Sequence, residues 1–299
     1  MLFYVCEFNK DIKLGECIMS KIISSDVKQQ MREFYQSRPM THKEVADKFG
    51  YCLPTVAKIL NGLPQYTKSN IFNPSLDEAF FEVINTEDKA YYLGLLITDG
   101  NVFKANEHRA SISITLDQRD AYLLTHWKEC IRSKTNLGHD GRGCVQYAVR
   151  SLKMANDLAK YGVVPRKTLC SYLPEIEDKS QLRHLIRGLI DGDGGIYAHM
   201  HNNKFSHQIK LCGTERLMYD VLECIDSELH LKYKPKVYTY RNRPLSMLQI
   251  SNIQDMNKLG HWLYNDASVY MDRKYRKFLD FQKHYGLANT EVSRQITKG

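Results

Sequence analysis

The sequence predicts an α+β fold: two tandem αββαββα units with antiparallel saddle-shaped sheets, related by a pseudo-two-fold axis, after a small all-α domain. Three observations predict it. An apolar helical stretch that ends in Asp-Gly occurs twice, at Tyr92–Gly100 and at Ile186–Gly194. Each copy precedes a similar succession of strand-like and helix-like segments. Residues 24–62 instead carry helix start and stop signals.

These patterns divide the chain into five segments. We expect an N-terminal segment with a helical domain over 1–62, a linker over 63–84, repeats over 85–180 and 181–285, and a tail over 286–299. The linker is indicated by its glycine, prolines and a Thr-Lys-Ser-Asn run.

Composition narrows the class of protein. The 299 residues are 43 % apolar and 25 % charged, which is typical of a globular protein. The net charge of +8 favours a polyanionic partner. The longest apolar runs are far shorter than the ~20 residues that cross a bilayer, so we expect no membrane association. The eight cysteines form no CxxC pair. We therefore expect reduced thiols in a cytoplasmic protein, neither disulfides nor zinc ligands.

The N-terminal domain shows three helical segments. The first begins at Ser24 and ends before Pro39. Thr41 and Glu44 have capping-box spacing, and Gly50 is a typical helix stop. A further helix then begins near Pro54.

This pattern is similar to a helix-turn-helix, with Ala46 at the helix crossing and Gly50 in the turn. Five apolar residues would form its core: Val45, Phe49, Leu53, Val56 and Ile59. The resemblance implies that the second helix enters the major groove of DNA, with Thr55 and Lys58 facing the duplex. It also favours a bacterial or phage-host setting. The alternative is a generic three-helix unit that packs on the rest of the chain.

The first repeat alternates after its motif helix. Between Arg109 and Leu116 the odd positions are polar and the even positions apolar, which predicts a strand with one solvated face. A helix over Gln118–Ile131, a strand over Cys144–Arg150 and a helix over Leu152–Tyr161 follow.

The second repeat shows the same order. We expect strands at Gly195–Met200 and Phe205–Leu211, a helix at Glu215–Leu229, strands at Lys232–Tyr240 and Leu245–Ser251, and a helix at Asn252–Tyr264. Helices would cover one face of each sheet and leave the other free for DNA.

Small residues mark the contact between the motif helices. Gly188 and Gly192 lie four residues apart, as do Gly94 and Thr98, so each pair shares one helix face. Two such helices can approach closely and deliver Asp99 and Asp193 side by side. A carboxylate at a helix C-terminus is unfavourable by about 0.3–1 kcal/mol, which indicates function, not stability.

The two stretches resemble the motif of the LAGLIDADG homing endonucleases, and the resemblance covers about residues 85–285. The second copy is close to the motif, whereas the first has Ile97 where the family often has Asp. The resemblance implies that Asp99 and Asp193 bind Mg²⁺ (or Mn²⁺), with the backbone carbonyls of Thr98 and Gly192 as further ligands.

A basic residue near each active site is also implied. Arg-Lys pairs follow the last helix of each repeat, and we expect Lys167 and Lys274 to orient water or stabilise phosphate charge. Alternatively they are phosphate contacts or surface lysines. Asp191 has no counterpart in the first copy, so we expect it to serve in capping or interhelical hydrogen bonding.

The segment 231–250 is the clearest nucleic-acid surface, because it is basic and has no acidic residue. Its basic residues are Lys232, Lys234, Lys236, Arg241 and Arg243. A solvated edge strand that carries lysines against aggregation is the alternative. Polar strand positions would read bases, and the candidates are Ser111, Ser113, Gln208 and Gln249.

Together, the patterns and the family resemblance imply a monomeric, Mg²⁺-dependent endonuclease that cuts both strands of a long pseudo-palindromic or asymmetric DNA target. The resemblance also implies a role in intron homing or in another mobile element. Two alternatives remain open: a DNA-binding transcriptional regulator that kept the fold without cleavage, and an RNA maturase on the same scaffold.

Overall fold

The computed structural model describes residues 23–287 apart from 38–39, 64–74, 140, 202–203 and 242. The chain forms two compact units, Met1–Pro74 and Ser75–Gly299. The segment before residue 23, most of the predicted linker and the tail beyond 287 lie outside the described residues.

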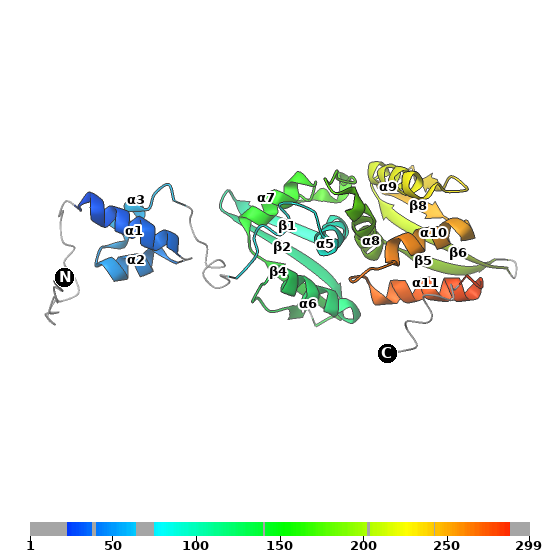
Figure 1. The fold of residues 1–299 in the computed structure, drawn as a ribbon, viewed down its shortest axis with the longest axis horizontal. Helices are drawn as coiled ribbons and strands as arrows, with labels where there is room; N and C mark the ends of the chain where they lie inside the picture. Colours follow the sequence, from blue (N-terminus) through cyan, green and yellow to red (C-terminus); the bar gives the residue numbers. More distant parts are fainter. Residues whose placement is uncertain are drawn as a thin grey trace. The chain divides into compact units, whose positions relative to one another are not determined.

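The first unit contains three helices: α1 (Ser25–Ser37), α2 (His42–Phe49) and α3 (Leu53–Ile59) (Figure 1). The predicted capping box is confirmed, because Thr41 Oγ1 accepts from Glu44 N–H and the Glu44 carboxylate accepts from Thr41 N–H. Gly50 ends α2 in the left-handed region, at φ +71°, which glycine adopts without strain.

The core of this unit differs in part from the prediction. Val45, Val56 and Ile59 are buried as expected, together with Met31, Tyr35, Met40, Ala46 and Leu60 from the same unit. Leu53 was wrongly placed in the core, since it is 50 % exposed at the first residue of α3. Phe49 packs at the edge of the core.

The first repeat begins with α5 (Glu87–Thr98). Its sheet has the order β1-β2-β4-β3 and is antiparallel throughout. The strands are β1 (Gly100–Asn106), β2 (Arg109–Asp117), β3 (Gly138–His139) and β4 (Cys144–Val149). The helices α6 (Ala121–Cys130) and α7 (Leu152–Lys160) follow β2 and β4.

The second repeat begins with α8 (Leu182–Asp193), and its antiparallel sheet has the matching order β5-β6-β8-β7. The strands are β5 (Gly194–His201), β6 (Lys204–Gly213), β7 (Lys236–Tyr238) and β8 (Ser246–Ile250). The helices are α9 (Glu215–Leu229), α10 (Ile253–Tyr264) and α11 (Asp272–His284). The predicted α+β class, with two four-stranded antiparallel sheets, is confirmed.

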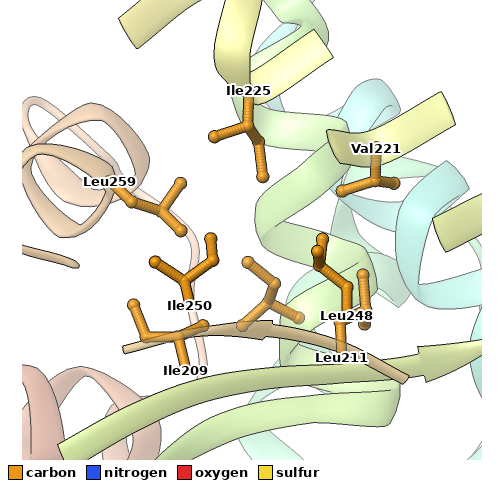
Figure 2. Close-up of a pocket in the computed structure, with 8 residues that line it drawn as sticks. Ile209, Leu211, Val221, Ile225, Leu248, Ile250 and Leu259 are labelled. Carbon is orange, nitrogen blue, oxygen red and sulfur yellow. The ribbon is translucent and has the colours of Figure 1, made fainter. Parts of the chain in front are cut away.

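Within the second unit, α5 and α8 lie together between the two sheets (Figure 1). The predicted alternation of β2 is confirmed, because Ile112, Ile114 and Leu116 point into the core while Thr115 is exposed. In the second repeat, apolar side chains of β6 and β8 meet those of α9 and α10, among them Ile209, Leu248, Val221, Ile225 and Leu259 (Figure 2).

Two predicted boundaries change. The linker ends earlier than residue 84, because Phe80, Phe81 and Ile84 are buried in the core of the second unit. The strand predicted over Lys232–Tyr240 is confined to β7, because the N–H groups of Lys232 and Tyr233 donate to the Asp255 carboxylate instead of a neighbouring strand.

The helix α11 was not predicted at all. It packs on the core through Phe278 and Phe281. None of the helices in the described part of the chain is long and apolar enough to cross a membrane.

Candidate active site

The motif helices α5 and α8 cross at two glycines. A Cβ on Gly94 would lie 3.0 Å from Gly188 Cα and would collide with the carbonyl oxygen of Leu185. A Cβ on Gly188 would lie 3.1 Å from Gly94 Cα and would collide with the carbonyl oxygen of Tyr91. Backbone therefore meets backbone at this crossing, as the spacing of small residues predicted.

The ends of the helices meet one turn further on. Gly192 packs directly on Thr98, since a Cβ at Gly192 would collide with Thr98 Oγ1. The next residue of each chain segment is a motif aspartate: Asp99 caps α5, and Asp193 is the last residue of α8. The crossing thus brings the two predicted acids into one cluster.

The carboxylates of Asp99 and Asp193 lie close enough to repel each other. Burial and the neighbouring Asp193 carboxylate raise the pKa of Asp99 from 3.8 to about 6, and burial also raises the pKa of Asp193. Among the described residues, neither carboxylate has a hydrogen-bond partner. Their oxygens are free to bind a cation, which would relieve the repulsion between them.

Lys167 and Lys274 occupy equivalent places beside these acids. Lys167 begins a 3₁₀ turn (Lys167–Leu169), and its Nζ donates to the carbonyl oxygens of Gly100 and, at 3.4 Å, Thr98. Burial lowers the pKa of Lys167, whereas the Asp193 and Asp99 carboxylates act in the opposite direction.

Lys274, in the first turn of α11, donates to carbonyl oxygens at the end of α8. The acceptors are Ile190 (2.9 Å), Asp191, Gly192 (3.2 Å) and Gly194 (2.8 Å). Burial lowers its pKa to about 8. Both ammonium groups are buried, so they are not the surface lysines of the alternative interpretation. They also lower the pKa of Asp99.

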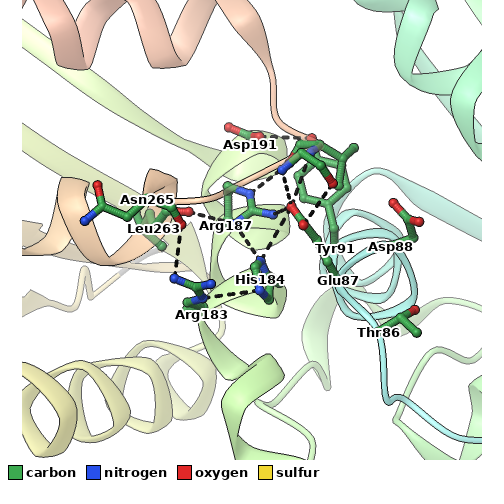
Figure 3. Close-up of polar contacts among 12 residues, drawn as sticks. Thr86, Glu87, Asp88, Tyr91, Arg183, His184, Arg187, Asp191, Leu263 and Asn265 are labelled. Carbon is green, nitrogen blue, oxygen red and sulfur yellow. Dashed lines mark hydrogen bonds and ion pairs between the residues drawn. The ribbon is translucent and has the colours of Figure 1, made fainter. Parts of the chain in front are cut away.

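Asp191 makes the interhelical hydrogen bond that the sequence predicted. Its Oδ2 accepts from the Tyr91 hydroxyl of α5 at 2.9 Å and from Met271 N–H at 2.8 Å, just before α11. Asp191 is fully buried, and burial raises its pKa to about 6. It thereby connects both motif helices to the helix that carries Lys274 (Figure 3).

No pattern in the sequence singled out Arg187, which is buried beside this aspartate (Figure 3). Its guanidinium donates to Glu87 Oε1 at 2.6 Å and to the carbonyl oxygens of Leu263 and Val269. Burial and this guanidinium lower the pKa of His184 to about 4, so His184 is neutral at pH 7. The Glu87–Arg187 pair joins α5 to α8 at their N-terminal halves.

The outer face of the first sheet carries short polar side chains. Ser111 and Thr115 alternate with the core residues of β2, and Gln146 of β4 donates to Thr115 Oγ1 at 3.2 Å. Ser113 shares this side but is only 8 % exposed, so it is the least accessible of the predicted base-reading residues.

The outer face of the second sheet carries a polar and basic row. The register aligns Lys236 of β7 with Gln249 of β8, and Gln249 with Lys210 of β6. Gln208, also predicted to read bases, pairs with Tyr197 of β5 in the next row. The sequence did not single out Lys210, although it follows Gln208 at the strand period of two.

All five basic residues predicted between 231 and 250 are exposed. Lys232, Lys234, Arg241 and Arg243 lie in the loops beside β7, and Lys236 lies in the strand itself. Tyr233, Lys236, Tyr238 and Gln249 line a surface pocket. The strand predicted over Lys232–Tyr240 is thus replaced by the short β7 with flanking loops.

In the first unit, Thr55 and Lys58 lie on α3. Lys58 is exposed, and Thr55 is half-buried with its hydroxyl 3.1 Å from Cys52 Sγ. Only one of the two predicted DNA contacts is therefore fully accessible.

Comparison by sequence finds no relative: no protein-family model and no curated protein matches the chain. In structure the chain is similar to LAGLIDADG homing endonucleases. I-SmaMI bound to an uncleaved DNA target in the presence of calcium ions is 13 % identical, with 72 % of this chain and 97 % of that chain covered and a TM-score of 0.49.

Two further structures give the same level of similarity. The LAGLIDADG meganuclease I-AabMI bound to uncleaved DNA is 13 % identical, with 66 % and 90 % coverage and a TM-score of 0.48. I-SmaMI bound to cleaved DNA is 13 % identical, with 71 % and 95 % coverage and a TM-score of 0.46. Similarity at this low identity concerns the fold and not the function.

Proposed function

We propose that this chain is a site-specific double-strand DNA endonuclease of the LAGLIDADG homing type. One observation carries the proposal: Asp99 and Asp193, one from each repeat, form a carboxylate pair at a glycine-packed helix crossing, with no hydrogen-bond partner in the part of the chain that the structure describes. Acids at helix C-termini, with a raised pKa and beside buried lysines, are characteristic of catalytic sites.

The donor set fits a hard divalent cation. Asp99 and Asp193 would hold it through carboxylate oxygens, and the carbonyl oxygens of Thr98 and Gly192 would add ligands, as the resemblance implies. Such oxygen ligands suit Mg²⁺ or Mn²⁺. The ion supplies the positive charge that phosphodiester hydrolysis needs at the attacked phosphate and the leaving oxygen.

The lysines hold the site together. Lys274 has four carbonyl acceptors for its three protons, so its role is to fix the end of α8. Lys167 has two acceptors and keeps one donor for a water or a phosphate oxygen. Both ammonium groups favour the ionised form of Asp99 that metal binding requires.

The DNA surface extends over both sheets. The row of Lys236, Gln249 and Lys210 offers two cations and an amide to phosphate and base edges. Basic loop residues add phosphate contacts, and the first unit would contact flanking duplex through α3 as a helix-turn-helix does. Because one chain supplies both acids, a monomer suffices for both cuts.

The test is a cleavage selection. A randomised duplex library is incubated with the full chain and Mg²⁺, and cut ends are sequenced to obtain the target. On that target, Asp99→Asn and Asp193→Asn should each lower cleavage by about 10³-fold or more. Glu223→Gln, which changes an exposed carboxylate on α9 to an amide, is the matched control and should cleave as wild type does.

Two results would contradict the proposal. Cleavage that survives both aspartate variants would place the catalytic groups elsewhere. Specific duplex binding without cleavage under Mg²⁺ or Mn²⁺ would instead identify a DNA-binding regulator on this fold.

A further inference from the structure

A second cluster of ligand-type side chains lies away from the motif aspartates, between α5 and α6. Asp88 lies in the first turn of α5, and His126 and Cys130 lie one turn apart on α6. Their ligand atoms lie within 4.8 Å of one another, and all three residues are half-buried. Nothing in the proposed cleavage chemistry uses them.

The hydrogen bonds of Tyr92 fix the proton on His126. The Tyr92 hydroxyl donates its one proton to the carbonyl oxygen of Leu123 at 2.8 Å. Its oxygen, 2.9 Å from His126 Nδ1, must therefore accept from Nδ1–H. The lone pair of the neutral ring is then on Nε2. A ligating histidine typically has its other nitrogen bound in this way.

That lone pair faces a carboxylate oxygen. Nε2 lies 3.7 Å from Asp88 Oδ1, which is buried and has no hydrogen-bond partner among the described residues. A cation between them would satisfy both acceptors. Two ligands on one tetrahedral ion, each about 2.1 Å from it, lie about 3.4 Å apart, close to the observed separation.

Cys130 supplies a third ligand. Its Sγ lies 3.9 Å from Nε2 and 3.8 Å from Nδ1, so it has to turn towards Nε2 to reach the same ion. A Cys-His-Asp nucleophilic triad does not fit, because Tyr92, not Asp88, holds Nδ1. Burial and Asp88 also raise the pKa of the thiol to about 12, which disfavours a free thiolate.

We infer that Asp88, His126 and Cys130 form a binding site for a zinc-class transition-metal ion. One sulfur, one imidazole nitrogen and one carboxylate oxygen suit Zn²⁺, whereas the oxygen-only cluster of Asp99 and Asp193 suits Mg²⁺. The ion connects the first turn of α5 to α6 and leaves one position for water. Its role is to stabilise the first repeat.

The second repeat provides an internal control. Helices α6 and α9 begin equally far after their motif aspartates, which makes Cys224 the counterpart of Cys130. At the positions equivalent to His126 and Asp88, however, stand Asp220 and Leu182. The second repeat thus keeps the thiol and lacks the imidazole and the first-turn carboxylate.

The test uses the full chain, stripped of metal by a chelator and kept reduced. Co²⁺, a spectroscopic substitute for Zn²⁺, should give the charge-transfer absorption of a cobalt–thiolate bond. Saturating Zn²⁺ should raise Tm, measured by tryptophan fluorescence, by about 5–10 °C. Asp88→Asn, His126→Gln and Cys130→Ser should abolish the Tm shift, and Cys224→Ser should keep both signals.

Three outcomes would overturn the inference. The first is the absence of a cobalt–thiolate band in the wild-type chain, which does not depend on any variant folding. The second is a band that survives Cys130→Ser but disappears in Cys224→Ser. The third is a Zn²⁺ shift that is lost when Asp99 and Asp193 are both changed to Asn, since the ion would then bind at the cleavage site.

Discussion

The helix crossing makes the sharpest structural prediction, through the variant Gly188→Ala. The new Cβ would lie 2.9 Å from Leu95 N, 3.1 Å from Gly94 Cα and still closer to the carbonyl oxygen of Tyr91. All of these atoms are backbone, so no side chain can turn away. The helices have to separate by about 1 Å, because ordinary carbon contacts are about 3.5–4.0 Å.

The expected cost follows from that separation. Overpacking of a rigid contact destabilises by about 3 kcal/mol, which corresponds to a Tm decrease of about 6–12 °C for a unit of this size. The same movement separates Asp99 from Asp193. A displacement of about 1 Å at a catalytic group lowers activity by about 10²-fold, so cleavage should fall more than the loss of folded protein explains.

Tryptophan fluorescence reports on the relevant unit, because both tryptophans of the chain lie in the second unit: Trp127 in its core and Trp262 packed against that core. Gly138→Ala is the matched control, since its Cβ would meet only Gln146 O at an ordinary 3.7 Å. We expect the control to unfold within about 2 °C of wild type. If Gly188→Ala also did so, the tight crossing would be refuted.

Three further predictions test the polar groups. Asp99 has a raised folded-state pKa of about 6, so it stabilises the fold below pH 4 and loses this contribution as pH rises through 6. In EDTA, Asp99→Asn should therefore raise Tm at pH 7.5 by more than at pH 4.5. Tyr91→Phe leaves buried Asp191 with one donor and should cost about 1.5–3 kcal/mol in urea unfolding. Lys236→Ala should reduce the slope of log binding constant against log salt concentration by the amount of about one phosphate contact. Lys179→Ala, which changes an exposed lysine just before α8, should leave this slope unchanged.

The sequence predicted helix caps and amphipathic helices well, because these depend on residues that are near one another in the chain. The helix Glu215–Leu229 agrees with α9 residue for residue, because Thr214 caps it and its apolar face repeats at the helical period. The capping box at Thr41 was confirmed for the same reason. The side chains concerned find their partners within a few residues.

Features that depend on distant partners were missed. Arginine is rarely fully buried, so the sequence offers no reason to expect a buried Arg187. Its acceptors, the carbonyl oxygens of Leu263 and Val269, lie far along the chain. The helix α11 was hidden because its segment is mostly charged, and its fully buried apolar side chains are Phe278 and Phe281 alone. Asp88 likewise comes near His126 only because α5 packs beside α6.

The motif aspartates show both what the sequence can predict and what depends on distant partners. Their position at helix C-termini is unfavourable by itself, since the dipole of each helix already places negative charge there. That conflict was visible in the sequence and indicated function. The family resemblance placed Lys167 and Lys274 near the acids, but the sequence did not indicate their bonds: both buried ammonium groups, from later segments, donate to terminal carbonyl oxygens of α5 and α8, which the helix dipole makes negative. The acid can therefore be recognised from its own helix, but the cation that makes it tolerable is supplied by the tertiary fold.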